Sequence, residues 1–454
     1  MENFGCRATQ ADGAAIERQF REQGLERARD AEQAEIVVIN SCTVTAAADQ
    51  DARAAIRRIH RQNPDCQIVV TGCYAQRAPE EIAALPGVSR VVGNSHKHEL
   101  ATIALAAGMP DGALDRGFVP LSRLASAGAI FVSDIFAHTE LLAAPVFDAA
   151  NERTRPNLKV QDGCDNRCSF CVIPYVRGQS RSLKLEQAVE EVRELVAAGY
   201  REVVISGINL GRWGRDFSSS SEGKKTRPQR FVALVRAILE QTLLEKLRIS
   251  SVEPMDWSEE LITLVAESPR IARHAHVPMQ SGSDRVLRAM HRKYRPWHYR
   301  EKIERIRAAM PEAAIGADVM TGFPGESDQD FEATRRMVEE LPFTYLHVFT
   351  YSARPGTPAA AMTEQVPVKV ARERTRALRE LAAEKKRSFM QSFVGKRLQA
   401  ITLNVVQSRA DGEFTETLTD NYLKLYLRGR HEPNRWTAAR VCEVGDEALR
   451  GVPA

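Results

Sequence analysis

Residues 154–384 alternate between short apolar runs and helical patterns, and this alternation constrains the fold more than any other feature. Helical patterns such as Leu185–Ala198, Phe231–Leu239 and Asp330–Glu340 separate the runs. Six runs are predicted as strands: Leu158–Gln161, Glu202–Ser206, Leu247–Ser250, Ala275–Pro278, Ile315–Met320 and Leu346–Tyr351. Repeated strand–helix units place strands parallel and close them into a barrel. Six units, where a full barrel has eight, predict an α/β fold with a partial (β/α)6 barrel.

The N-terminal third shows the same alternation in a separate block. Glu35–Asn40 and Gln67–Thr71 are β-branched runs, each followed by a helical pattern (46–62 and 79–84), and Val88–Val92 is a candidate third strand. We therefore predict that residues 1–105 form a domain with a doubly wound parallel sheet. Residues 106–153 show no steady period and are predicted to connect the two domains.

The C-terminal part, residues 385–454, has the pattern of a small all-β domain. A charged helix over 371–388 is expected to lead out of the barrel. It is followed by three predicted strands, Arg397–Val406, Glu413–Tyr426 and Trp436–Val444. This part holds 12 Lys/Arg against 8 Asp/Glu, which accounts for the whole net charge of +4. A local basic excess favours an acidic partner.

Basic and aromatic residues interleave in this C-terminal part. The set is Lys396, Arg397, Lys424, Arg428, Arg430 and Arg435, with Tyr422, Tyr426 and Trp436 among them. Cations that follow phosphates and rings that stack on bases are typical of an RNA-binding surface. The same composition also fits an ordinary solvated face of a β-domain, so the residues alone leave both interpretations open.

Composition limits where the protein is expected to work. Hydrophobic residues make up 43% of the 454, enough for ordinary cores, and no apolar run approaches the roughly 18 residues of a membrane span. The first residues, MENFGCRATQ, lack the charged-then-apolar order of a signal peptide. The eight cysteines are then predicted to be reduced thiols and metal ligands. We expect a cytoplasmic protein that does not enter a membrane.

Three cysteines lie close together just after the first barrel strand. Cys164, Cys168 and Cys171 are spaced C-x3-C-x2-C on one short loop. Soft thiolates suit an iron–sulfur cluster, and a loop that supplies three ligands to a cubane leaves one iron open for a small molecule. Zinc is not favoured because neither a histidine nor a second CxxC pair lies nearby. The alternative, three buried structural thiols, fits poorly with a polar, turn-rich loop.

Three more cysteines follow predicted strand ends in the N-terminal domain. Cys42 and Cys73 come just after the two β-branched runs, and Cys6 follows a short possible strand, MENFG. The carboxyl ends of parallel strands share one edge of a sheet, where ligands gather. The three thiols can therefore converge, although each alone would more simply be a buried structural thiol. Cys66 and Cys442 carry no motif and are predicted to be structural, with Cys442 in the core.

The run VQDGCDNRCSFCVIPYVRGQSRS (160–182), with Phe170 before the last cysteine, resembles the radical SAM superfamily and, within it, the methylthiotransferases. The resemblance implies that Cys164, Cys168 and Cys171 are the catalytic ligands of a [4Fe-4S] cluster. Its open iron would hold S-adenosylmethionine, whose reductive cleavage gives a 5′-deoxyadenosyl radical. Arg181 in this run either positions substrate or sulfur or is simply solvated.

The segments around the N-terminal cysteines, GCRAT, NSCTVT and TGCYAQ, are similar to the three cluster motifs of methylthiotransferases. This similarity implies a second [4Fe-4S] cluster, held by Cys6, Cys42 and Cys73, that carries the sulfur to be inserted. The chain departs from the family at Thr9, where an asparagine is usual, which leaves the surroundings of this cluster open.

Other family-like segments follow in the expected order through the barrel: SGINLGRWG, HVPMQSGSDRVLRAMHRKY, GADVMTGFPGE and VFTYSARPGTPA. They imply adenosylmethionine contacts at Ser206, Gly207, Glu253, Gly322 and Gly325, whereas TGFPGES by itself predicts only a tight turn. TDNYLKLYL resembles the TRAM module, which implies RNA binding by the C-terminal domain.

LKVQDGC is most similar to the branch that acts on N6-threonylcarbamoyladenosine at position 37 of tRNA. The resemblance implies three partners: a tRNA anticodon loop, a sulfur donor and an electron donor. Two alternatives keep the chemistry but change the substrate, to isopentenyladenosine in tRNA or to an aspartate of a ribosomal protein. A third alternative is a non-catalytic iron–sulfur protein that binds RNA and does not cleave adenosylmethionine.

Overall fold

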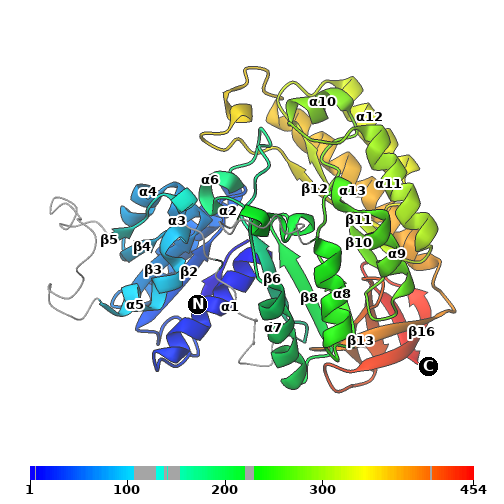
Figure 1. Ribbon diagram of the computed structural model, residues 1–454, viewed down its shortest axis with the longest axis horizontal. Coiled ribbons are helices and arrows are strands. Elements are labelled where there is room, and N and C mark those ends of the chain that lie inside the picture. The colour runs from blue at the N-terminus through cyan, green and yellow to red at the C-terminus, as the bar shows by residue number, and fades with distance from the viewer. Residues whose placement is uncertain (6, 107–128, 138–140, 142–153, 220–229, 410–411) are drawn as a thin grey trace.

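The computed structural model describes residues 1–5, 7–106, 129–137, 141, 154–219, 230–409 and 412–454. Three bodies follow one another along the chain (Figure 1): an N-terminal sheet with its helices, a central sheet backed by long helices, and a small C-terminal barrel. None of the helices in these ranges combines the length and apolarity needed to cross a membrane.

The N-terminal sheet has five parallel strands in the order of the chain. They are β1 (Glu2–Asn3), β2 (Ile36–Ser41), β3 (Gln67–Gly72), β4 (Val88–Val92) and β5 (Ala129–Phe131). The strands predicted at 35–40, 67–71 and 88–92 are all present. β5 comes from the segment predicted as a connection and pairs with β4. The strand order does not reverse anywhere, so the doubly wound prediction is wrong in this respect.

Helices cover both faces of this sheet, because successive side chains of a strand point to opposite sides. Val37 and Ile39 pack with Ile56, whereas Val38 packs with Ile16 on the other face. The helices are α1 (Arg7–Glu22), α2 (Ala46–Gln62), α3 (Cys73–Arg77), α4 (Pro79–Ala83) and α5 (Leu100–Leu105). α2 matches its predicted range, and the Thr45 side chain caps it by accepting a hydrogen bond from the Ala48 N–H. α1 was not predicted.

The central sheet contains all six predicted strands in parallel. They are β6 (Asn157–Asp162), β8 (Glu202–Gly207), β9 (Lys246–Ile249), β10 (His274–His276), β11 (Ala314–Thr321) and β12 (Tyr345–Thr350). Isolated bridges, such as Ser251 with His276, join the ladder that ends at β9 to the one that starts at β10. The short β7 (Arg181–Ser182) pairs antiparallel with β6. In the described ranges β12 pairs with β11 alone, so the series does not close.

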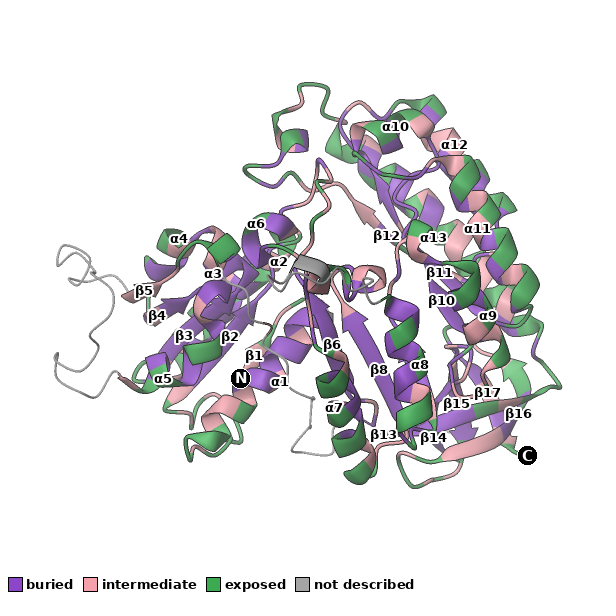
Figure 2. Cartoon of the chain, viewed as in Figure 1, coloured by how far each residue is buried: buried purple, intermediate pink, exposed green. Residues whose placement is uncertain are grey.

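Helices form the outer layer of the central sheet. They are α7 (Leu185–Ala197), α8 (Phe231–Gln241), α9 (Glu259–Glu267), α10 (Asp284–Ala289), α11 (Pro296–Ala309), α12 (Asp328–Glu340) and α13 (Val368–Gln391). Apolar strand residues such as Val160, Val203 and Val319 pack under them in the main core. Most of the strands are buried, whereas β12 at the edge is largely intermediate, and the helices expose their outward sides (Figure 2). Alternate strand positions, including Gln161, lie on the opposite face, which we call the inner face.

The C-terminal part is a closed five-stranded barrel. Its strands are β13 (Arg397–Arg409), β14 (Gly412–Thr419), β15 (Lys424–Arg428), β16 (Trp436–Val444) and β17 (Leu449–Pro453). The predicted strand Glu413–Tyr426 is wrong as one element, because it turns at 420–423 into the β14–β15 hairpin. The core prediction for Cys442 is also wrong. The alternation of β16 buries Val441 and exposes its neighbour Cys442.

This barrel covers the end of the central sheet at which the strands begin. Tyr422, at the hairpin turn, lies 4.5 Å from the His274 ring and 5.6 Å from the Tyr345 ring, centroid to centroid. Arg248 donates to the carbonyls of Thr419 and Asp420. The sequence left open whether Tyr422 stacks on RNA bases or lies on a solvated face. In the structure its ring packs against His274 and Tyr345 and is partly buried.

Candidate active site

The loop of Cys164, Cys168 and Cys171 leaves the carboxyl end of β6 and enters the short helix α6 (Ile173–Arg177). It begins at Gly163, whose φ is +69° and where a Cβ would meet the Gln179 carbonyl oxygen at 1.9 Å, so only glycine fits. The Cys164 N–H donates to the Gly178 carbonyl, and the Cys171 N–H to the Cys168 carbonyl. The backbone thus holds the three thiols on one compact loop.

The surroundings of these thiols suit metal ligands. Asn209 Nδ2 lies 3.6 Å from Cys164 Sγ, and an Arg292 nitrogen lies 3.3 Å from Cys168 Sγ. Burial raises the pKa of the Cys164 thiol and raises that of Cys171 to about 12. Binding a cluster would displace these protons, because thiolates are the ligands. Arg292 and Asn209 can donate hydrogen bonds to the cysteine sulfurs when these sulfurs are negatively charged thiolates.

Three polar atoms without partners among the described residues lie at the end of the central sheet from which this loop leaves. Ser206 Oγ, Asn209 Oδ1 and Gln280 Oε1 are buried, and no described residue forms a hydrogen bond with them. All three residues lie at or beyond the carboxyl ends of β8 and β10, and Gln280 has a positive φ of +63°. Because buried polar atoms are normally paired, these atoms fit a polar ligand such as adenosylmethionine.

The other residues predicted to contact adenosylmethionine divide into two groups. Glu253 is ion-paired with Arg292 and lines a small pocket with Cys168. The three glycines are explained by packing within the chain. A Cβ on Gly207 would lie 2.9 Å from Gln161 Cβ, and one on Gly322 would lie 2.4 Å from Ala371 Cβ. Gly325 has a φ of +79°, and its N–H donates to the Glu364 carbonyl. A contact between these glycines and adenosylmethionine stays a prediction.

The N-terminal cysteines lie where β2 and β3 end. Ser41 pairs with Gly72, so the next residues, Cys42 and Cys73, leave the sheet at the same edge, and both are buried. The chain before Cys6 passes beside Cys42, because a Cβ on Gly5 would lie 2.8 Å from Cys42 Sγ. Cys6 itself lies outside the described residues. The structure therefore brings two of the three predicted ligands to one edge.

The two groups of cysteines face the same joint between the first two domains. Cys73 packs against Val172, Ile173 and Val176, which directly follow Cys171. Asn94 donates to the Val176 carbonyl at 2.7 Å, and its Nδ2 lies 3.6 Å from Cys73 Sγ. Sequence spacing did not predict this contact, because the two segments are about a hundred residues apart.

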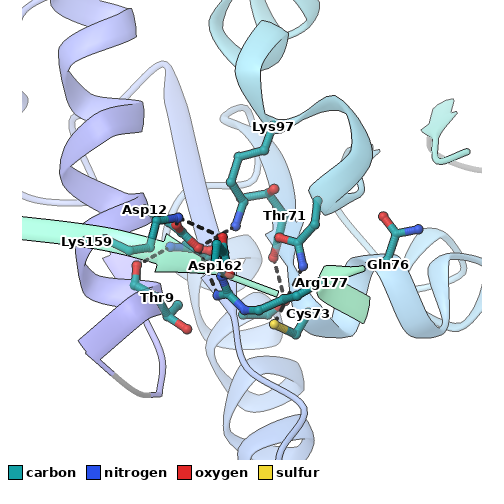
Figure 3. A network of polar contacts seen from close by, with 12 residues as sticks. Thr9, Asp12, Thr71, Cys73, Gln76, Lys97, Lys159, Asp162 and Arg177 are labelled. Atoms are coloured by element: carbon teal, nitrogen blue, oxygen red, sulfur yellow. Dashed lines mark hydrogen bonds and ion pairs between the residues drawn. The ribbon is translucent and has the colours of Figure 1, made fainter. Parts of the chain in front are cut away.

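Buried ion pairs connect the N-terminal domain to the central domain at this joint (Figure 3). Asp12 of α1 pairs with Lys97 and Arg177, both at 2.9 Å, and with Lys159. Asp162 of β6 pairs with Lys159 at 2.8 Å and with Arg177 at 2.9 Å. Burial by itself would raise the pKa of both carboxyls, but the surrounding cations hold each pKa well below its usual range. We call these five residues the joint network.

Arg181 belongs beside this network. It is only 9% exposed, donates to the Arg177 carbonyl at 2.8 Å and lies 4.0 Å from Asp162. The interpretation of Arg181 as a solvated side chain is therefore wrong. Asp12 and Lys159 were not predicted as functional or structural residues. The available signal was a lysine inside an otherwise apolar strand, which requires a buried partner.

The N-terminal domain also contacts the far edge of the central sheet. Arg354, in the loop after β12, pairs with Asp49 of α2, and Arg77 pairs with the same carboxylate at 3.0 Å. The Ala46 N–H donates to Ser352 Oγ at 3.1 Å. α1 meets β6 at one edge and the start of α2 meets the β12 loop at the other. The N-terminal domain therefore contacts the central sheet at both of its edges.

The inner face is polar, which the sequence did not indicate. Asp318 Oδ1 lies 3.4 Å from His276 Nε2 and 3.3 Å from His347 Nδ1. Burial would raise the pKa of Asp318, but the two histidines hold it well below its usual range. In the described part of the chain this is the one set of three such ligands close enough to hold a single metal ion. Without a metal the three groups form ion pairs, while His276 Nε2 has no hydrogen-bond partner among the described residues.

Comparisons with known proteins agree with this geometry. The family model described as Radical SAM superfamily matches residues 158–338, and the one described as Uncharacterized protein family UPF0004 matches residues 1–93. Among solved structures, the radical S-adenosylmethionine methyltransferase TsrM from Kitasatospora setae matches with a TM-score of 0.50 and 17% identity, over 76% of this chain and 66% of that one. The fold and the cysteine loop define a radical SAM enzyme.

Curated relatives show which group of radical SAM enzymes this chain is similar to. "Threonylcarbamoyladenosine tRNA methylthiotransferase MtaB" of Bacillus subtilis is 36% identical over 95% of this chain and 90% of the relative. The protein of that name from Aquifex aeolicus is 35% identical over 95% and 97%. "tRNA-2-methylthio-N(6)-dimethylallyladenosine synthase" of Novosphingobium aromaticivorans is 33% identical over 88% and 85%. The chain belongs to the radical SAM methylthiotransferase family. Membership implies adenosylmethionine and a [4Fe-4S] cluster.

Proposed function

We propose that this enzyme converts N6-threonylcarbamoyladenosine at position 37 of tRNA into its 2-methylthio derivative. The observation that carries the reaction class is the joint at which Cys73 packs against the helix that follows Cys171. A sulfur-bearing site and a radical-generating site must serve the same base, and this joint holds the two cysteine groups together. The substrate rests on relatives named for threonylcarbamoyladenosine, which are 32–36% identical to this chain.

Each cysteine group has its own proposed role. Cys164, Cys168 and Cys171 would hold the [4Fe-4S] cluster that binds adenosylmethionine, in the radical SAM barrel formed by the central sheet. Cys42 and Cys73, with Cys6, would hold a second [4Fe-4S] cluster that carries the sulfur. When bound, these groups supply reductive cleavage of adenosylmethionine, methylation of sulfur and its insertion at C2 of adenine. An electron donor and a sulfur donor are required as partners.

The side chains of the protein bind adenosylmethionine, orient the cysteine sulfurs and enclose the reactive species in this proposal. Ser206, Asn209 and Gln280 offer unpaired polar atoms to adenosylmethionine, and Gly207, Glu253, Gly322 and Gly325 are the further proposed contacts. Arg292 and Asn209 orient the cysteine sulfurs by hydrogen bonds. The N-terminal domain, fastened at both edges of the central sheet, helps to shield reactive species from water. The C-terminal barrel is a TRAM-like domain in this proposal, and the anticodon loop of tRNA is the bound substrate.

The test is mass spectrometry of tRNA nucleosides from cells with and without the gene. The 2-methylthio derivative of threonylcarbamoyladenosine should vanish on deletion. It should return with the wild type and with Cys442→Ala, an exposed cysteine outside both groups, but not with Cys168→Ala. Loss of the isopentenyladenosine derivative instead would keep the chemistry and change the substrate, in line with relatives named for dimethylallyladenosine. No change in either nucleoside contradicts the proposal.

A further inference from the structure

A row of arginines runs along α13 beside the open edge of the central sheet. Arg372, Arg376 and Arg379 are spaced by four and three residues, so they lie on one side of the helix. They line a groove of about 580 Å³ together with Thr350 of β12, Thr375, Glu380 and Ala383. All three arginines are exposed. We call this the α13 groove.

Two of the three arginines in this groove are left without a partner among the described residues. Arg372 and Arg376 form no ion pair or hydrogen bond with any described residue, and Arg379 donates to the Val348 carbonyl at 2.9 Å. Glu380 is the one acidic residue of the lining, so the groove keeps two net positive charges. An arginine left exposed and unpaired retains its full fork of donors for an anion.

Basic residues of the C-terminal barrel are different. Lys396 pairs with Glu312 at 2.9 Å, Lys424 with Glu416 at 3.0 Å, and Arg435 with Glu432 at 3.1 Å. Half of the cations predicted to bind RNA there are thus neutralised by neighbours. Arg397, Arg428 and Arg430 stay exposed. The α13 groove is a second basic surface, on another domain.

The position of the groove connects it to the inner face. Thr350 ends β12, whose outer edge has no strand partner in the described ranges. Thr350 and Val348 point toward α13, where Thr350 Oγ1 lies 2.9 Å from Thr375 Oγ1. His347 lies on the other face, and its side chain is 62% exposed. Strand β12 therefore lies between the groove and the inner face.

We propose that the α13 groove binds phosphates of the RNA backbone and holds the loop so that its target base passes the edge of β12 to the inner face. This inference rests on the proposed function, in which RNA is the substrate. Arginine forks match phosphate oxygens in a bidentate manner, and the threonine hydroxyls add neutral donors. The arginines therefore contribute backbone contacts that are independent of base identity.

The experiment measures binding of a fluorescent RNA hairpin with the anticodon-loop sequence to the full chain, over a series of salt concentrations. Arg372→Ala/Arg376→Ala should raise the Kd roughly tenfold at ~0.1 M salt, because two phosphate contacts are lost. The slope of log K against log salt should fall by about 1.5. The matched control is Arg57→Ala/Arg61→Ala on α2. This variant removes two exposed arginines at the same spacing, neither of which has a partner among the described residues. It should bind the hairpin like the wild type.

Each other result has a definite meaning. Wild-type affinity and slope for Arg372→Ala/Arg376→Ala would overturn the inference and leave the proposed function intact. Equal weakening of both double variants would overturn it too, since binding would then follow total charge. A wild-type chain that does not bind the hairpin would contradict RNA as the substrate, and the inference would fall with the proposed function. Adenosylmethionine cleavage without RNA should match the wild type in both double variants, which shows that they fold.

Discussion

At the residue scale, the joint depends on a few buried charges whose partners come from distant parts of the chain. Asp12 accepts from Lys97, Lys159 and Arg177, and Asp162 accepts from two of these cations. Three cations thus share two carboxylates in a buried space. Removing one carboxylate leaves unbalanced charge, which costs more than the intact pairs contribute.

Asp12→Asn should therefore destabilise the protein strongly, by about 3–5 kcal/mol. The measurement is the thermal unfolding midpoint at neutral pH, compared with Glu17→Gln. Glu17 lies on the same helix, is only partly buried and has no partner among the described residues, so its loss should cost less than about 0.5 kcal/mol. Equal midpoints for the two variants would show that the joint network does not hold the domains together.

Glu191 on α7 makes stability depend on pH in a specific direction. Burial, and after it repulsion from Glu194, raises the pKa of Glu191 to about 7. The unfolded carboxyl releases its proton near pH 4.3, roughly the ordinary glutamate value. Between these two pH values the folded state binds more protons than the unfolded state, so the free energy of unfolding falls as the pH rises.

Glu191→Gln should consequently raise the melting temperature at pH 8 and leave it nearly unchanged at pH 4. Melting curves of the two proteins at several pH values test this, with Glu190→Gln as the control on the neighbouring, exposed position. If the melting temperature of Glu191→Gln rises as much at pH 4 as at pH 8, the pKa of Glu191 is not raised.

At the element scale, α13 is held against the loop after β11 by close packing and ion pairs. Arg374 pairs with Glu326 at 2.6 Å and with Asp328 at 2.7 Å. Gly322 allows this approach, since its φ is +74° and a Cβ there would lie 2.4 Å from Ala371 Cβ. The glycine is needed for its backbone conformation and for space.

Gly322→Ala should destabilise the protein by about 3 kcal/mol, of which backbone strain accounts for about 1 kcal/mol. Gly356→Ala separates the two causes, because Gly356 has a φ of +84° and nothing within 4 Å of a Cβ. Gly356→Ala should therefore lower the free energy of unfolding only by the backbone strain. Ala371→Gly should partly rescue Gly322→Ala in denaturant unfolding curves. If both glycine variants lose the same stability, the clash is not the cause.

Elements with a strong local pattern were predicted, and those without one were missed. The strands of the central sheet follow from short apolar runs that alternate with helical patterns. α1 was missed because its helical pattern carries few large apolar residues, and the β14–β15 turn because Tyr422 adopts a left-handed φ of +66° without a glycine. β17 is short and ends in Pro453, which weakens a strand signal.

For the whole molecule, the N-terminal domain is fastened at both edges of the central sheet. The joint network lies at the β6 edge, and Arg354 with Asp49 lies at the β12 edge. Loosening the second contact alone should let the proposed sulfur-bearing site move away while the proposed adenosylmethionine site stays intact.

Arg354→Ala should thus lower methylthiolated product about tenfold, with little change in the 5′-deoxyadenosine formed, a loss that corresponds to roughly 1.4 kcal/mol. The ratio of the two products in one reaction is the measurement. Arg354→Lys should restore part of the coupling, because it keeps a cation near Asp49. Arg335→Ala, which removes two exposed ion pairs within α12, is the control. A parallel loss of both products would indicate general damage.

The sequence by itself determined the features that depend on local order. Strand and helix periods placed the six central strands, and cysteine spacing placed Cys164, Cys168 and Cys171 on one loop and Cys42 and Cys73 at strand ends. Tertiary structure alone decided which distant groups meet. Three contacts show this: Asp12 with Arg177, Cys73 with α6, and Tyr422 with the start of the central strands. Each joins segments that no sequence periodicity connects, because the pairing of buried charges and rings depends on proximity in space.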